Sequence, residues 1–308
     1  MGKASKAKRD GSSRQQRIAA QRAAARRAEI RNRVLIAGGS VVVVIAIVLA
    51  FVLVKVNSGG SKGTSTSSSG PTGTALSSVV KDTTTVPAST LDAVGAGSVT
   101  APPQKLNGGS ALTANGKPEM LYMGAEYCPY CAAERWGMVV ALSRFGTFKD
   151  LGTTHSASGD VFPNTSTWTF YKSTYTSKYV SFSSVEMETN KLASGGQGYT
   201  ALQTPTSAQN ALMSKYDAPP YVSSANEGAI PFIDFGNKWL ISGSSYSPQV
   251  LQGKTWSQIA TALKSPDSAI AKAVDGAANY ITAALCQLTG NQPASACTPA
   301  VQALEKKL

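Results

Sequence analysis

The stretch that decides the fold is Pro118-Glu119-Met120-Leu121-Tyr122-Met123-Gly124-Ala125-Glu126-Tyr127-Cys128-Pro129-Tyr130-Cys131. Its apolar first half, bounded by turn residues, predicts a short buried strand that ends at Gly124. The composition of the next segment, from Ala132 to Leu142, favours a helix, and Pro129 stands where the first helical turn tolerates proline. The order strand, turn, Cys-x-x-Cys and helix predicts an α/β domain with two cysteines at a helix start.

The position of these two cysteines indicates redox chemistry. Three residues apart on a first helical turn, their sulfurs can close a small disulfide, and the first thiol lies against unpaired backbone N–H groups. A cysteine at this place can have a pKa well below the free value of about 8.5, and the thiolate is the attacking species. We therefore predict that Cys128 is the nucleophile and Cys131 the resolving cysteine of thiol–disulfide exchange.

Two segments resemble a known fold family. Gly124 to Cys131 is similar to the active-site segment of thioredoxins, with a glutaredoxin-like Pro-Tyr dipeptide between the cysteines. The segment Gly228-Ala229-Ile230-Pro231-Phe232-Ile233-Asp234-Phe235-Gly236 looks like the thioredoxin segment in which a cis-proline faces the disulfide. The resemblance implies that Pro231 is cis, which costs only about 0.5 to 1 kcal/mol, and that Ile230 touches an extended substrate. Tyr127, Pro129 and Tyr130 would shape the substrate groove.

Most of the chain also resembles a prokaryotic family of membrane-anchored proteins called domain of unknown function 929, through segments such as GAEYCPYCAAERW, YVSFSSVE and AIPFIDFGN. This resemblance implies a thioredoxin-like fold and brings no established substrate. About a hundred residues separate Cys131 from Pro231, which predicts an insertion between the Cys-x-x-Cys helix and the cis-Pro strand. Its polar loop 146–167 could cover the redox site or be a surface insertion without a role.

The N-terminal quarter predicts a membrane anchor. Residues 1–33 hold eleven of the chain's 29 Lys and Arg residues and two of its 17 Asp and Glu residues. An uncharged run of 21 residues follows from Val34 to Val54, and at about 1.5 Å per residue it spans the roughly 30 Å of a bilayer core. We predict a basic cytoplasmic segment at 1–33, one transmembrane helix at 34–56 and a Ser/Gly/Thr-rich linker at 57–75. An extracytoplasmic domain would then occupy 76–308, so the protein would be a single-pass protein of the cell membrane.

Further elements are expected after the redox motif. The patterns predict strand-like runs at 167–172 and 179–188, a helix at 205–216, a hairpin of 232–235 with 238–243, and a helix at 255–264. The longest helix would follow Ser265 as its N-cap and end at Gly290. The stretch 76–103, with several Pro and Gly residues, predicts loose structure.

The other two cysteines allow several interpretations. Cys286 near the end of the longest helix and Cys297 could form a structural disulfide, worth on the order of 3 kcal/mol for a loop of this size. A second redox pair is an alternative. A four-cysteine zinc site is less well matched, because only one short Cys-x-x-Cys unit exists. We expect no metal and no cofactor. The alternative for Cys128 and Cys131 is a purely structural disulfide outside the cell, where oxidation is the default.

The sequence thus predicts a thiol–disulfide oxidoreductase that acts on extracytoplasmic Cys-containing proteins. Its electrons would pass to or from an unidentified membrane redox partner, and the motif is compatible with oxidase, reductase and isomerase activity. Glu126 could transfer the proton of Cys131, or be a solvated surface acid. A nucleic-acid partner is not expected, because the basic excess lies in the N-terminal segment. The competing hypothesis is a non-enzymatic binding module that holds a peptide or envelope component near Pro231.

Overall fold

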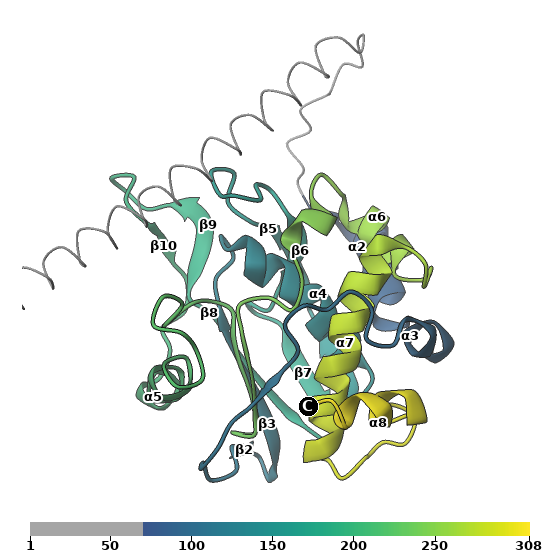
Figure 1. Cartoon of the computed structure of the whole chain (residues 1–308). Coiled ribbons are helices and arrows are strands. Elements are labelled where there is room, and N and C mark those ends of the chain that lie inside the picture. The colour runs from purple at the N-terminus through teal and green to yellow at the C-terminus, as the bar shows by residue number, and fades with distance from the viewer. Residues whose placement is uncertain (1–69) are drawn as a thin grey trace, which may run out of the picture. The chain divides into compact units, whose positions relative to one another are not determined.

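The computed structural model describes residues 70–308 (Figure 1). The predicted basic segment 1–33, the transmembrane helix 34–56 and most of the linker 57–75 lie outside the described residues. From residue 70 onward, no helix is both long and apolar enough to cross a membrane.

A mixed six-stranded sheet forms the centre of the described part. Its strands follow the order β1, β12, β11 and β3, and β3 also pairs with β8 and β2. β8 is parallel to β3, whereas β11 is antiparallel to β3 and β12 is antiparallel to β11. The strands are β1 Gln104–Lys105, β2 Thr113–Ala114, β3 Lys117–Gly124, β8 Ser181–Glu186, β11 Phe232–Phe235 and β12 Trp239–Ser242.

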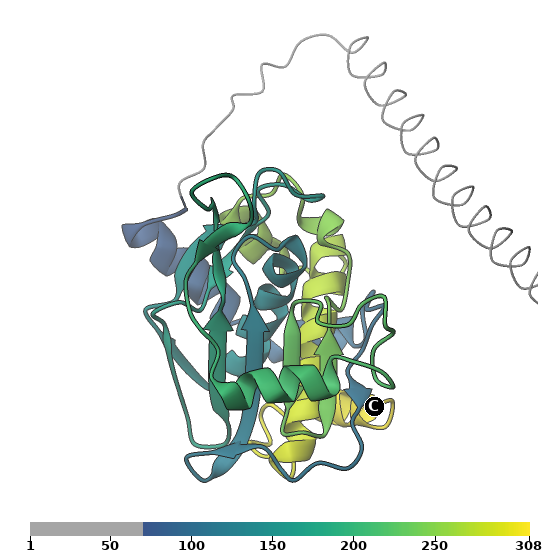
Figure 2. The ribbon, with the colours of Figure 1, turned by 90° about the vertical axis from the view of Figure 1, so that its left-hand side faces the viewer.

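Helices cover both faces of this sheet. They are α2 Gly73–Thr84, α3 Ala88–Val94, α4 Pro129–Ser143, α5 Ser207–Tyr216, α6 Trp256–Ala262, α7 Ala269–Leu288, α8 Pro299–Glu305 and the 3-10 helix η1 Pro248–Leu251. Helix α5 crosses the strands on one side (Figure 2), whereas α4 and α7 lie together on the other (Figure 1). The domain therefore has three layers, with the sheet in the middle.

Alternate side chains of β3 enter two separate hydrophobic cores. Met120 and Tyr122 join the larger core with α4 and α7, and Leu121 and Met123 join a smaller core with Tyr216 at the end of α5. Successive side chains of a strand point to opposite faces. A strand covered on both faces is apolar at every position, which explains the uninterrupted apolar run in this part of the sequence.

The region between α4 and β11 holds three two-stranded ribbons in addition to β8 and α5. They are β4 Gly146–Lys149 with β7 Thr174–Ser177, β5 Gly152–His155 with β6 Ser166–Thr169, and β9 Glu188–Leu192 with β10 Tyr199–Ala201. The prediction of a polar loop at 146–167 was therefore wrong in part, because two strands and the start of a third lie within it. Thr-rich polar segments form these ribbons because β-branched residues favour strands even where one face of the ribbon is exposed to solvent.

The N-terminal part of the domain is also more regular than predicted. Residues 73–94 form α2 and α3 rather than a loose segment, and Val79 and Leu91 are buried in the larger core. In α2, the residues facing the core are Leu76, Val79 and Val80, at helical spacing. Burial of this face on the rest of the domain stabilises a helix whose Ser- and Thr-rich sequence favours it weakly.

Helix α7 begins three residues later than expected. Ser268, not Ser265, is its N-cap, and the Ser268 side chain accepts a hydrogen bond from the Ala271 N–H at 2.9 Å. Ser265 instead accepts the N–H of Ser268 at its carbonyl, within a turn that precedes the helix. The other predicted elements are confirmed with small shifts of their ends: β3, α4, β6, β8, α5, the β11–β12 hairpin and α6. Capping boxes begin α5 at Thr206 and α6 at Thr255.

A disulfide joins Cys286, near the end of α7, to Cys297, just before α8. This is the pairing that the sequence analysis favoured. Both cysteines are buried, and they tie the C-terminal helix to α7.

Candidate functional site

The Cys-x-x-Cys motif forms the N-terminal end of α4. Cys128 is the N-cap with extended backbone, Pro129 is the first helical residue, and the N–H of Cys131 donates to the sulfur of Cys128 at 3.5 Å. Cys128 keeps 6% of its surface exposed, whereas Cys131 is fully buried. An incoming reactant can therefore meet only the sulfur of Cys128 directly.

The surroundings of the two thiols shift their pKa values in opposite directions. The pKa of Cys128 is lowered mainly by a hydrogen bond from the Cys131 side chain, and further by the N–H groups of Cys131 and Tyr130 and the charge of Arg135, although burial opposes this. The pKa of Cys131 is raised, first by burial and then by its hydrogen bond to Cys128. The first thiolate to form is that of Cys128, because only its anion gains these donors.

A buried ion pair lies behind the cysteines. Arg135, one helical turn beyond Cys131, donates from Nε and Nη2 to the two carboxylate oxygens of Glu186 at 2.9 and 2.7 Å. Both side chains are fully buried. Nη2 also donates to the carbonyl of Ala125 at 2.7 Å, and Nη1 has no hydrogen-bond partner among the described residues. The guanidinium thus connects the turn before the motif to the end of β8.

Tyr122 fills the space between this ion pair and Cys131. Its hydroxyl donates to Oε2 of Glu186 at 3.4 Å, and the Arg135 guanidinium lies 5.8 Å from the centre of its ring. A Cβ atom on Gly124 would lie 2.2 Å from the Tyr122 oxygen and 2.9 Å from the Cys131 sulfur. Only glycine therefore fits at position 124, where the strand passes against both groups.

The second predicted motif meets the first in space. The Ile230–Pro231 bond is cis, as the resemblance implied, and the sulfur of Cys128 donates to the Ile230 carbonyl at 3.6 Å. The carbonyl of Pro231 is fixed by the N–H of Gly243 at 2.8 Å. Residues about a hundred positions apart in the sequence thus lie on opposite sides of one sulfur.

The predicted groove residues lie around Cys128 and Cys131, and residues between α4 and β11 contact them. The ring of Tyr127 stacks on Tyr199 of β10 at 4.1 Å, and its carbonyl accepts the N–H of Ala157 at 2.8 Å. Tyr130 is 41% exposed and meets the edge of Phe162 with ring centres 6.1 Å apart. Loop 156–165 therefore lies beside the Cys-x-x-Cys motif.

Glu126 is half-buried, and its side chain makes no hydrogen bond to either cysteine within the described part of the chain. Its backbone N–H donates to the carbonyl of Glu188 at 2.9 Å. The structure thus joins Glu126 to the ribbon β9–β10 through its backbone, and its predicted proton transfer remains a prediction.

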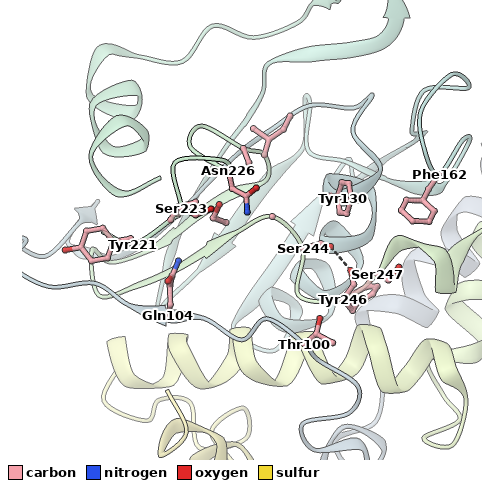
Figure 3. A pocket seen from close by; sticks show the side chains of 15 residues that line it. Thr100, Gln104, Tyr130, Phe162, Tyr221, Ser223, Asn226, Ser244, Tyr246 and Ser247 are labelled. Carbon is pink, nitrogen blue, oxygen red and sulfur yellow. Dashed lines mark hydrogen bonds between the residues drawn. The ribbon is translucent and has the colours of Figure 1, made fainter. Parts of the chain in front are cut away.

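A cavity of about 740 Å³ opens beside the motif (Figure 3). It lies between Tyr130 and the loops that flank β11 and β12. The residues that line it are Thr100, Gln104, Tyr130, Phe162, Tyr221, Val222, Ser223, Asn226, Ala229, Ile230, Ser242, Gly243, Ser244, Tyr246 and Ser247.

Sequence reasoning missed Arg135, Glu186 and Tyr122. A signal existed for the first two, because each is a charged residue inside a segment that otherwise has the composition of a buried helix or strand. Such residues are almost never fully buried unless paired. Their pairing required knowledge that β8 lies next to β3, which the sequence pattern alone does not provide.

The remaining cysteines and the sole histidine are placed elsewhere. Because Cys286 and Cys297 are bonded to each other, a zinc site made of all four cysteines is excluded. His155 lies at the end of β5, where its Nδ1 is 2.9 Å from the Ser156 carbonyl and 3.3 Å from the Asn190 side chain.

These features define a mixed α/β domain with a dithiol at the start of a buried helix and an ion pair behind it. The chain belongs to the family described as Domain of unknown function (DUF929), whose model matches residues 106–287. The matched region includes Cys128 and Cys131, the ion pair and the Ile230–Pro231 bond. No curated protein and no solved structure matches the chain significantly.

Proposed function

We propose that this chain is a thiol–disulfide oxidoreductase that works through Cys128 and Cys131. The observation that carries the proposal is the difference between the two thiols. Cys128 keeps 6% of its surface exposed and its pKa is lowered by hydrogen-bond donors, whereas Cys131 is fully buried with a raised pKa. A nucleophile and a resolving cysteine need these two different environments.

The finer fold assignment is part of the proposal. The order of strands β8, β3, β11 and β12, with the dithiol helix after β3 and the cis-proline before β11, supports the proposal of a thioredoxin-like domain. The ribbons and α5 between α4 and β11 would be the predicted insertion. In this proposal β3, α4, β8, β11, β12 and α7 are the common framework.

The proposed reaction proceeds by two exchanges. The Cys128 thiolate attacks one sulfur of a substrate disulfide, so that a mixed disulfide forms and the other substrate sulfur leaves as a thiolate that takes a proton from water. Cys131 then loses its proton and attacks Cys128, which releases the second substrate thiol and leaves a Cys128–Cys131 disulfide. Two electrons pass from the pair to the substrate, and the reverse sequence oxidises a substrate dithiol.

The ion pair would support these steps from behind. The positive charge of Arg135 stabilises both thiolates, since it lowers the pKa of Cys128 and partly offsets the effect of burial on Cys131. Glu186 keeps Arg135 in place through the paired hydrogen bonds. Glu126, at the rim, is a candidate proton acceptor for Cys131, and unchanged exchange rates at every pH in Glu126→Gln would remove it from the mechanism.

The cellular setting follows from the first 75 residues. We propose that the basic segment 1–33 is cytoplasmic, that 34–56 spans the lipid bilayer, and that the domain acts outside the cytoplasm on Cys-containing proteins. There, an unidentified membrane redox partner would return the pair to its starting state.

A binding module is the second candidate, and the cavity beside Ile230 is the observation that favours it. Single-cysteine variants separate the two. The full chain, purified in detergent, would be incubated with a disulfide-bonded protein substrate. Under the redox proposal Cys131→Ser accumulates a mixed disulfide at Cys128, and Cys128→Ser does not. Equal binding by both variants with no mixed disulfide would contradict the redox proposal and favour the binding module.

A further inference from the structure

The cavity continues directly from the reactive sulfur. Ile230 lines the cavity, and its carbonyl lies 3.6 Å from the sulfur of Cys128. Tyr130, between the two cysteines, lines the cavity as well. A chain whose cysteine reacts at Cys128 therefore has its flanking residues beside this cavity.

The walls are polar but uncharged. None of the fifteen lining side chains carries a formal charge. In Figure 3, Asn226 and Ser223 lie above Gln104, the ring of Tyr221 lies at the left, and the rings of Tyr130 and Phe162 lie at the right. The wall thus offers hydroxyl and amide groups for hydrogen bonds and aromatic rings for apolar contact.

The aromatic walls are held in place before any ligand binds. The hydroxyl of Tyr221 donates to the Asn107 carbonyl at 2.8 Å and accepts the N–H of the same residue at 3.2 Å. The hydroxyl of Tyr246 donates to the carbonyl of Ala133 at 2.6 Å. Rings fixed in this way lose little conformational freedom on binding, which favours affinity.

The nearest buried acid is not available to a ligand. Glu134 lies on α4 behind the cavity wall and accepts hydrogen bonds from the backbone N–H and the hydroxyl of Ser245 at 2.8 and 2.9 Å. It is fully buried and does not line the cavity. A charged group that packed against these walls would therefore lose part of its water without gaining an opposite charge from a lining side chain, which is unfavourable.

The size of the cavity indicates a polypeptide segment. Its 740 Å³ lies within the range of about 300–1,000 Å³ that is usual for ligand sites, and several residues of an extended chain fit into it. Small anionic thiols such as glutathione fit the walls poorly, because no lysine or arginine there pairs with their carboxylates.

We propose that this cavity selects substrates whose reactive cysteine is flanked by uncharged polar and aromatic residues. The inference rests on the proposed redox function and adds its substrate class.

The test uses the full chain in detergent, reduced beforehand, in single turnovers. Three peptides of equal length each carry one cysteine as a mixed disulfide with mercaptoethanol. In the neutral peptide the cysteine is flanked by Ser, Asn and Tyr. In the two charged peptides it is flanked by Asp residues or by Lys residues. Bis(2-hydroxyethyl) disulfide is the small neutral reference. We expect the neutral peptide to react about tenfold or more faster than either charged peptide, since only charged flanks lose water without compensation.

Asn226→Asp adds one negative charge at the exposed rim of the cavity, and Asn210→Asp makes the same change on the exposed surface of α5. The first variant should shift the ratio of the Lys peptide to the Asp peptide by roughly three- to fivefold. The second variant, which lies outside the cavity, should leave both this ratio and the reference rate unchanged.

Equal rates for all three peptides would overturn the inference and leave the redox function intact. The inference would also be overturned, with the redox function intact, if a neutral oligosaccharide bound in the cavity and the residues that flank the cysteine in the peptides had no effect on the rate. If the reduced pair does not reduce even the reference disulfide, the redox function itself fails, and the substrate class fails with it.

Discussion

Cys128 and Cys131 have the same side chain and opposite surroundings. Hydrogen-bond donors point at the sulfur of Cys128, and the helix that starts there adds its favourable N-terminal field. Cys131 is buried away from water, and the groups around it stabilise its thiolate less than burial disfavours it, so its thiol stays protonated. The proposed chemical roles follow from where the helix begins, because a shift of the helix start by one residue would remove the donors from Cys128.

The alkylation of the reduced protein tests this difference. Iodoacetamide should modify Cys128 first, with a rate that is half-maximal at a pH below the free-thiol value of about 8.5. Cys131 should stay unmodified until the protein unfolds, since its sulfur is buried. Peptide mapping by mass spectrometry after timed quenching gives both rates. Faster modification of Cys131 would contradict the assigned roles.

The Arg135–Glu186 pair should be far more sensitive to mutation than an exposed ion pair. Glu186→Gln keeps the shape of the side chain but leaves the buried guanidinium without its opposite charge, so we expect a loss of about 3–5 kcal/mol in unfolding free energy. The control is Lys264→Met, which breaks the pair of Lys264 with Asp82, whose side chains are 45% and 31% exposed. This change should cost about 0–1 kcal/mol. Similar costs in urea unfolding would show that burial does not govern the Arg135 pair.

At the scale of elements, the insertion and the C-terminal disulfide act on different parts of the domain. Loop 156–165 and the ribbon β9–β10 are bonded to the motif through Tyr127 and Glu126. The Cys286–Cys297 disulfide lies between α7 and α8, away from the helix start that carries Cys128 and Cys131. The insertion is therefore part of the candidate site, whereas the disulfide contributes to stability.

Removal of the disulfide checks this separation. The double variant Cys286→Ala, Cys297→Ala should lose on the order of 3 kcal/mol of stability, mainly because the unfolded chain is less restricted. Its exchange rate with bis(2-hydroxyethyl) disulfide should match that of the parent. A variant that still unfolds cooperatively but has lost exchange would support the alternative of a second redox pair.

Elements were predicted well wherever a local pattern dominates. The apolar run of β3, the helix after Cys131 and the helices predicted at 205–216 and 255–264 depend on neighbours in sequence. Helix α2 was missed because its stability comes from burial of Val79 on distant elements. The cysteines and Pro231 were found by motif, but the partnership of Arg135 with Glu186 arises from the parallel pairing of β3 with β8, which only the fold brings about.

At the scale of the whole molecule, three buried acids make folding sensitive to pH. Burial raises the pKa of Glu134 and Asp234 to about 7 and that of Asp275 to about 8. Neither carboxylate oxygen of Asp275 has a hydrogen-bond partner among the described residues. In the unfolded chain such groups titrate near about 4. The folded state therefore holds protons that the unfolded state releases, so the contribution of these three acids to stability is fully present below about pH 4 and is lost as the pH rises towards 8.

Asp275→Asn should reduce this loss. Between pH 5 and 8.5, we expect the unfolding free energy of the variant to fall less than that of the parent, because one of the three acids no longer titrates. Asp267→Asn, the same change at an exposed position next to α7, controls for the lost charge. Urea unfolding at each pH gives the free energies, and identical slopes for parent and Asp275→Asn would contradict this explanation.

The most direct test of the redox function is the reduction potential of the Cys128–Cys131 pair. The full chain in detergent would be equilibrated in glutathione and dithiothreitol buffers, and its thiols counted by alkylation and mass. We predict one reversible two-electron transition, lost in Cys128→Ser, with a potential between about −270 and −120 mV. A pair that stays in one state across the whole range would contradict the proposal.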